Sequence, residues 1–307
     1  MPVGNNYSAE RVGDWGVPAA APGGAYDTAQ LKMTDGTALF YRSWQAADPA
    51  APVLVFLHGL GAHTGWFIDL GNELNARGLS VYMDDHRGFG RSEGARGHVR
   101  RGAVYLDDIE HLLAEVGRRQ PDAPVFLCGH SMGAIFAVLT AAADATSGRN
   151  RLSGLILANP WIRDTSKPTI GLAWSVYARG AFGSARPIHA AGGPEAMTTN
   201  AEATRMLLAD TQWVRAESGS FFYQVLKLRG RVLKAARTVS VPALVIQSEQ
   251  DLAVVPKASR QCYEALGSTD KTWKTYPGFA HDFEFEQARS TFDDDLSDWI
   301  MRHRLPR

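Results

Sequence analysis

The sequence predicts an α/β protein with a mostly parallel central sheet that helices cover on both faces. Short apolar runs of strand length alternate along the 307 residues with longer segments of helical periodicity. This alternation implies right-handed crossovers between parallel strands. The composition, with 45% apolar and 21% charged residues, is that of an ordinary globular protein.

The strands are predicted from short segments that are rich in apolar and β-branched residues. They are 38–44, 53–57, 79–83, 125–128, 154–158, 243–247 and 271–276. The first has the character of an edge strand. The second, VLVFL, is apolar throughout, which is typical of a strand that is buried on both faces of a parallel sheet.

Helices are predicted between most of these strands. They cover about 65–77, 105–116, 134–143 and 286–303. In the second helix the apolar positions fall at i, i+4, i+7, i+8 and i+11, and they are Tyr105, Ile109, Leu112, Leu113 and Val116. This spacing places them on one face of an amphipathic helix.

Residues 160–236 interrupt the alternation, because they contain no predicted strand and only short helical patterns between Gly and Pro residues. We expect this insertion to form a helical cap at one end of the sheet, between core segments 29–159 and 237–307. Its aromatic residues either pack the cap onto the core or line a cleft for a ligand with a hydrocarbon chain. Trp174 and Phe222 are candidates for the cleft.

Residues 1–28 are predicted to be a flexible leader, since 13 of them are Ala, Gly or Pro. They lack the cationic start and continuous apolar run of a secretory signal. Together with the two cysteines, Cys128 and Cys262, this favours a cytoplasmic location. Two cysteines are also too few for a disulfide framework or a zinc cluster.

The 32 basic residues balance the 32 acidic ones, which gives no electrostatic attraction to nucleic acid or to anionic lipid. Nucleic acid is therefore not an expected partner. No apolar run approaches the 18 residues that a membrane span needs.

The candidate nucleophile is Ser131, in the pentapeptide GHSMG at 129–133. The pattern G-x-S-x-G follows an apolar strand directly and precedes an apolar helix. A serine on such a strand-to-helix turn needs tiny residues two before and two after it, and Gly129 and Gly133 stand there. The positive end of the following helix favours negative charge developing beside the serine.

A serine hydroxyl needs a base, and the base needs an orienting acid. Asp251 follows the strand at 243–247, and His281 follows the strand at 271–276, so both belong at the same sheet edge as Ser131. The rival carboxylates are Asp282, adjacent to the histidine in sequence, and Glu249, which precedes the loop tip. His130 is next to the nucleophile, but we expect its side chain to point away from it.

An acyl-transfer transition state carries an oxyanion, which two backbone N–H groups stabilise. The amide of Met132, directly after the nucleophile, is the first candidate. The second is the amide of Leu60, in the segment HGLG that follows the strand at 53–57.

These features resemble the α/β-hydrolase superfamily, and within it the monoacylglycerol lipases and bacterial lysophospholipases. The resemblance covers about residues 30–303. It rests on DGTALFYRSW at 35–44, HGLGAHTGWF at 58–67, DHRGFGRSEGARG at 85–97, VFLCGHSMG at 125–133, VPALVIQSEQDLAVVP at 241–256 and the loop with His281. Ala134 stands where a third glycine is common, and the cap matches the family only loosely.

The resemblance implies a catalytic triad of Ser131, Asp251 and His281, with the amides of Leu60 and Met132 as oxyanion hole. It implies a serine ester hydrolase that cleaves lipid-type carboxylic esters, monoacylglycerols or lysophospholipids, through an acyl-enzyme and without metal or cofactor. The expected partner is a small ester with an apolar acyl chain, with at most transient contact of the cap with a membrane surface. The sequence specifies no oligomeric state.

Other activities of the same triad stay open. They are general carboxylesterase, C–C hydrolase, amidase and perhydrolase activity. A binding module without catalysis would usually lack one triad residue, whereas all three are present here.

Overall fold

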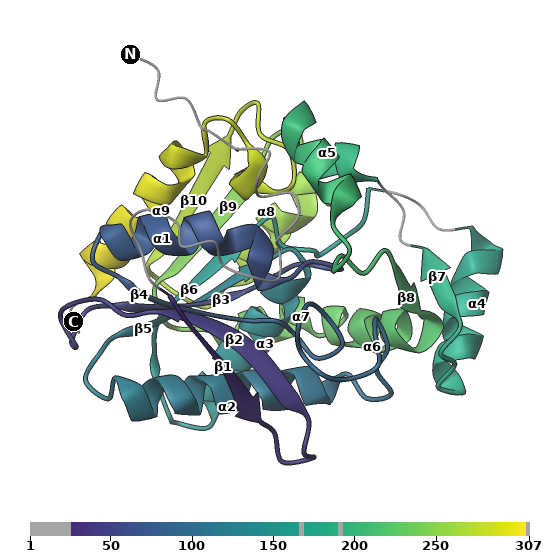
Figure 1. The fold of residues 1–307 in the computed structure, drawn as a ribbon, viewed down its shortest axis with the longest axis horizontal. Helices are drawn as coiled ribbons and strands as arrows, with labels where there is room; N and C mark the ends of the chain where they lie inside the picture. The colour runs from purple at the N-terminus through teal and green to yellow at the C-terminus, as the bar shows by residue number, and fades with distance from the viewer. Residues whose placement is uncertain (1–25, 166–168, 190–192, 305–307) are drawn as a thin grey trace.

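The computed structural model describes residues 26–165, 169–189 and 193–304. The predicted leader, 1–28, lies almost wholly outside the described residues. One sheet has the strand order β1-β2-β4-β3-β5-β6-β9-β10 (Figure 1). Its strands are β1 Asp27–Lys32, β2 Ala38–Trp44, β3 Val53–Leu57, β4 Ser80–Asp84, β5 Val125–His130, β6 Leu152–Ala158, β9 Ala243–Ser248 and β10 Lys271–Tyr276.

The sheet is parallel from β4 to β10, whereas β1 and β2 pair antiparallel with their neighbours. The prediction that 38–44 is an edge strand is wrong, because β2 lies between β1 and β4 and is almost fully buried. The edge is β1, which the sequence analysis missed because its pattern DTAQLK is polar and largely exposed. β1 also begins at Asp27, inside the predicted leader.

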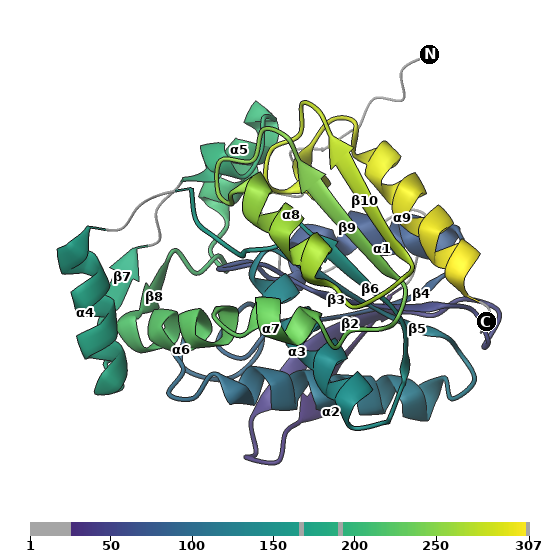
Figure 2. The same cartoon turned by 180° about the vertical axis from the view of Figure 1, so that it is seen from behind.

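Two apolar cores lie on opposite faces of the sheet. Val53, Val55 and Leu57 of β3 belong to one core, and Leu54 and Phe56 belong to the other, as the alternation of a strand requires. The first core includes helices α2 Ala103–Arg119, α3 Met132–Thr146 and α8 Pro256–Ala265. The second includes α1 Ile68–Ala76 and α9 Arg289–His303 (Figures 1 and 2). The predicted α/β class with helices on both faces is therefore confirmed.

The insertion lies beside one end of the large sheet (Figures 1 and 2). Its helices are α4 Ile170–Ala181, α5 Ala201–Ala209, α6 Gly219–Arg229 and α7 Val232–Ala236. The prediction that it contains no strand is wrong, because β7 Pro187–His189 and β8 Ala216–Ser218 form an antiparallel pair. Strands of three residues are too short to show a periodicity in sequence. The exact limits of the cap stay a prediction.

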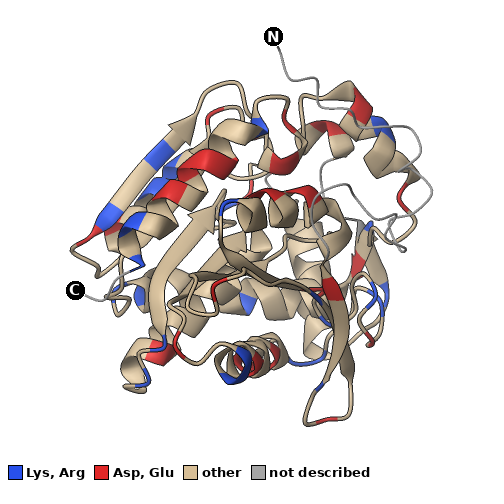
Figure 3. Ribbon diagram, turned by 60° about the vertical axis from the view of Figure 1, so that its left-hand side comes forward, with Lys and Arg blue, Asp and Glu red and all other residues tan. Residues whose placement is uncertain are grey.

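Basic and acidic residues are interspersed over the described helices and strands (Figure 3). This agrees with the formal net charge of zero. In the described part of the chain, every helix is too short or too polar to span a bilayer.

Candidate active site

Ser131 lies on the tight turn that joins β5 to α3. Its backbone has φ 52° and ψ −111°, a conformation that L residues rarely adopt. The turn depends on its two glycines. A Cβ on Gly129 would lie 2.4 Å from the carbonyl oxygen of Gly133, and a Cβ on Gly133 would lie 2.2 Å from that of Leu57.

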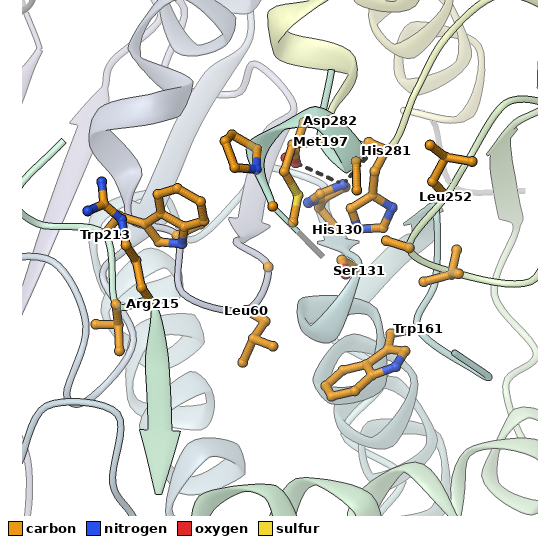
Figure 4. A pocket seen from close by; sticks show the side chains of 18 of the residues that line it. Leu60, His130, Ser131, Trp161, Met197, Trp213, Arg215, Leu252, His281 and Asp282 are labelled. Atoms are coloured by element: carbon orange, nitrogen blue, oxygen red, sulfur yellow. Dashed lines mark hydrogen bonds and ion pairs between the residues drawn. The ribbon is translucent and has the colours of Figure 1, made fainter. Parts of the chain in front are cut away.

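Asp251 and His281 come from the loops after β9 and β10, and the structure brings them together. His281 Nδ1 donates a hydrogen bond of 2.8 Å to Asp251 Oδ2. Oδ1 of Asp251 accepts hydrogen bonds from the amides of Ala253 and Val254, at 2.8 and 2.9 Å. Ser131 and His281 line one cavity, with the serine beside the imidazole ring (Figure 4).

The pair has shifted acid–base properties. Burial by itself raises the pKa of Asp251, but the neighbouring His281 and the two backbone amides outweigh burial and hold it below its ordinary value. Burial by itself lowers the pKa of His281, but the charge of Asp251 and their hydrogen bond raise it above the ordinary value. The pair therefore holds the imidazole in one orientation and favours its protonated form during proton transfer.

The rival carboxylate Asp282 contacts a different histidine. Its Oδ1 lies 3.3 Å from Nε2 of His130, and the same nitrogen lies 3.1 Å from the carbonyl oxygen of His281 (Figure 4). Since a carbonyl only accepts, His130 Nε2 carries the proton. Burial lowers the pKa of His130 to about 3, so its ring is neutral. His130 lines the cavity, and its proton is directed to the loop of His281.

Asn159, at the end of β6, also holds this loop and was missed in the sequence analysis. Its Nδ2 donates to the carbonyl oxygen of His281 at 2.6 Å, and its Oδ1 accepts from the amide of Ser248 at 2.7 Å. The residue is fully buried and has φ 43°. The one sequence signal was an Asn directly after a buried strand, at the sheet edge where the triad residues lie.

The segment with Leu60 is held from both sides. On the core side, the buried His58 donates from Nδ1 to the carbonyl of Gly59 at 2.8 Å and accepts at Nε2 from the amide of His86 at 3.0 Å. On the cap side, Nε2 of His63 lies 2.8 Å from Oδ2 of Asp210. Leu60 lines the cavity.

Met132 is the first residue of α3, where backbone N–H groups have no partner within the helix. Its position beside Ser131 is the one that an oxyanion donor requires. The assignment of the Leu60 and Met132 amides to the oxyanion hole stays a prediction.

The cavity has a volume of about 480 Å³, in the usual range for small-molecule sites. Residues of the insertion supply a mainly apolar wall, which includes Trp161, Met197, Leu208, Trp213, Val214 and Phe222. Phe222 lines the cavity and is 9% exposed, and its role in substrate binding stays a prediction. Trp174 is not part of this wall, because it lies on α4, is 66% exposed and packs edge-on against Tyr177.

Four Asp, Glu or Arg residues also line the cavity, namely Asp164, Arg215, Glu217 and Asp282. No local sequence pattern indicates Glu217, and burial raises the pKa of its carboxyl group to about 8. Within the ranges that the structure describes, no group of three or more His, Cys, Asp or Glu residues is arranged to hold a metal ion.

The family described as Serine aminopeptidase, S33, matches residues 48–288 of the chain. This span is well over half of the sequence, so the chain belongs to this family of α/β hydrolases. The family resemblance predicted from the sequence motifs is thereby confirmed.

Monoacylglycerol lipases are among the similar proteins. The chain is 28% identical over 286 residues to the monoglyceride lipase of Mus musculus, with 91% of each chain covered. It is 26% identical over 271 residues to the monoacylglycerol lipase of Mycolicibacterium smegmatis, covering 87% of this chain and 94% of that protein. The crystal structure of a soluble variant of Saccharomyces cerevisiae monoglyceride lipase, in complex with a substrate analog, shares the fold. Its TM-score is 0.80 at 21% identity, with 95% of this chain and 99% of that chain covered.

Proposed function

We propose that this protein is a serine esterase that hydrolyses lipid-type esters, with monoacylglycerols as its preferred substrates. Ser131 Oγ attacks the ester carbonyl, and His281 Nε2 accepts the serine proton. The collapse of the tetrahedral intermediate expels the alcohol, which takes this proton, and leaves the acyl group on Ser131. His281 then removes a proton from water, which attacks the acyl-enzyme. His281 returns this proton to Ser131 Oγ as the bond to the acyl group breaks and the fatty acid leaves.

Asp251 and the oxyanion hole complete this mechanism. Asp251 holds Nδ1–H of His281 and stabilises the imidazolium in each transition state. The amides of Leu60 and Met132 stabilise the negative charge on the carbonyl oxygen. The chemistry uses no cofactor.

One observation carries the proposal. The Asp251–His281 hydrogen bond of 2.8 Å and the strained turn of Ser131 meet at one cavity whose remaining wall is mainly apolar. A nucleophile beside an oriented base, in a site that accommodates a hydrocarbon chain, suits a lipid ester.

The names of the relatives and the charges in the cavity support monoacylglycerols in particular. Of the four charged residues in the wall, three are acidic. The one cation, Arg215, already donates to the carbonyl oxygens of Leu207, Leu208 and Asp210. A phosphate group would meet three carboxyl residues and one arginine in the described wall, so we expect lysophospholipids to be poorer substrates.

The exposed side chains of α4 support transient contact of the cap with a membrane surface. Ile170 and Trp174 are 80% and 66% exposed, and Phe182 follows the helix at 89%. Apolar side chains exposed this far are typical of surfaces that meet lipid or another protein. A cytoplasmic location stays a prediction.

The experiment compares kcat/KM for 1-lauroylglycerol, lauroyl-lysophosphatidylcholine, p-nitrophenyl acetate and an aminoacyl p-nitroanilide. We expect the glycerol ester to be cleaved fastest and the lysophospholipid more slowly. A preference for acetate would replace the lipase with a general carboxylesterase. Faster cleavage of the anilide would replace it with an aminopeptidase, the activity in the family's description.

A further inference from the structure

Glu217 is a buried carboxyl residue in the wall of the cavity, and neither the triad nor the oxyanion hole uses it. It lies in the middle of β8 and is 1% exposed. Its Oε2 has no hydrogen-bond partner within the described residues. Burying a carboxyl group without a partner costs free energy, so a side chain of this kind calls for a physical explanation.

The fold does not supply that explanation. β8 is held by its backbone, because Glu217 pairs with Ile188 of β7 and the amide of Ser218 donates to the carbonyl of Gly97 at 2.8 Å. Gly97 allows close packing here, since a Cβ on it would lie 3.2 Å from Cα of Glu217. The strand pairing thus uses the backbone of residue 217. The carboxyl group is hydrogen-bonded to the backbone of its own residue, and its Oε2 is left without a partner in the described chain.

The other Asp and Arg side chains of the wall differ from Glu217, because each has a partner from another residue of the protein. Asp164 accepts a hydrogen bond from Trp161 Nε1 and pairs with Arg229 at 2.8 Å. Asp282 lies beside His130, and Arg215 is held by backbone carbonyls. Within the described residues, Glu217 is the member of this set with a buried carboxyl oxygen that lacks a hydrogen-bond partner.

The protonation state of Glu217 defines which ligand fits. Burial raises its pKa to about 8, so the group is mostly a neutral carboxylic acid at pH 7. A neutral acid has one O–H donor and a carbonyl acceptor side by side. A hydroxyl group also donates and accepts, and it brings no charge into an apolar wall.

We propose that Glu217 binds an uncharged hydroxyl group of the substrate and makes the enzyme selective for hydroxyl-bearing esters. The hydroxyl belongs either to the glycerol that leaves or to the acyl chain. This inference rests on the proposed ester hydrolysis, and it adds the residue that recognises the polar part of the ester.

The test uses Glu217→Gln, which keeps a donor and an acceptor, and Glu217→Leu, which removes both. Glu202→Leu is the matched control, because it removes an exposed carboxylate from α5 of the same cap. One substrate pair is 1-lauroylglycerol and methyl laurate. The other is methyl 12-hydroxylaurate and methyl laurate. The readout is the ratio of kcat/KM within each pair, with thermal unfolding measured for every variant.

For one of the two pairs, we expect Glu217→Leu to lower the ratio about tenfold, the scale of one buried hydrogen bond. We expect Glu217→Gln to keep the ratio within about threefold of the wild-type value, and Glu202→Leu to leave it unchanged. The affected pair identifies the source of the hydroxyl. Unchanged ratios in both pairs, or an equal loss on all three esters, would overturn the inference.

A binding measurement separates this inference from the proposed function. Calorimetry measures ligand affinity in the Ser131→Ala protein, with and without the added Glu217→Leu substitution. The affinity for 1-O-dodecylglycerol is compared with that for dodecyl methyl ether, and the affinity for methyl 12-hydroxylaurate with that for methyl laurate. If the wild type cleaves no ester, the proposed function fails. The inference still stands if Glu217→Leu selectively weakens binding of a hydroxyl-bearing ligand, and it fails if no selective loss is seen.

Discussion

The two walls of the cavity are built in different ways. On the core side, Asp251 makes hydrogen bonds with both oxygens, and the carbonyl of His281 accepts from His130 and Asn159. On the cap side, Glu217 has a buried oxygen without a partner in the described chain, and most of the other lining side chains are apolar. The Asp251–His281 pair is thus fixed by hydrogen bonds within the core, whereas the cap contributes apolar side chains and the unpartnered Oε2 of Glu217.

From this difference we expect the core wall to act in catalysis and the cap wall to determine substrate selectivity. Residues of the core wall act on the reacting carbonyl, which every ester has in common. Changes there should lower activity on all substrates by a similar factor. Residues of the cap wall meet the parts in which esters differ, so changes there should alter the ratio between substrates.

The largest expected effect is that of His281→Ala. Without the base, kcat should fall by about 10⁶, on short and long esters alike. Stopped assays with p-nitrophenyl butyrate and 1-lauroylglycerol measure this. Turnover near the wild-type level would show that another residue is the base, and a loss on one ester alone would break the division between the walls.

Asn159→Ala tests whether activity depends on the hydrogen bond from Asn159 to the carbonyl oxygen of His281. A histidine displaced by a fraction of an ångström should lower kcat by about 10- to 100-fold and change KM little. Asn150→Ala is the matched control, because Asn150 also has a positive φ, 49°, but is exposed. Equal kinetics for the two variants would show that Asn159 does not position the base.

Phe222→Ala and Trp174→Ala compare two aromatic residues of the cap. Each acyl methylene buried against Phe222 contributes about 0.8 kcal/mol. Phe222→Ala should therefore lower kcat/KM for laurate about tenfold more than for acetate, as measured with the p-nitrophenyl esters. For soluble substrates, Trp174→Ala should leave the ratio of kcat/KM for laurate to that for acetate within about twofold of the wild-type ratio. A larger change would place Trp174 in contact with the acyl chain.

The smallest expected effect is a shift in the pH dependence of kcat/KM. His281 must be neutral to accept a proton, so kcat/KM for p-nitrophenyl butyrate, which has no hydroxyl group for Glu217, should rise with one ionisation and stay high above it. Because Asp251 raises the pKa of His281, the rise should lie above the ordinary histidine value of about 6.5. Removing this charge in Asp251→Asn should move the residual profile to lower pH. A flat profile between pH 5 and 9 would contradict a histidine base.

Local sequence patterns predict most of the core wall and little of the cap wall. The sequence predicts every strand of the large sheet except the polar β1, and a five-residue motif identifies the turn of Ser131. The role of Asn159 depends on a loop 122 residues away, and Glu217 lies in a three-residue strand. Neither the contact of Asn159 nor the position of Glu217 produces a periodic or local pattern in the sequence. The aromatic residues of the cap make Trp174 a candidate for the cleft. Aromatic content alone does not distinguish an exposed helix face from a buried one, and Trp174 is exposed.

The most direct test of the account is the covalent labelling of Ser131. Wild-type protein is incubated with an alkyl fluorophosphonate, and its intact mass is measured, followed by peptide mapping. We expect one adduct per chain, on Ser131, and none in Ser131→Ala. An unmodified wild-type protein that is folded, or an adduct that persists in Ser131→Ala, would show that Ser131 is not the nucleophile.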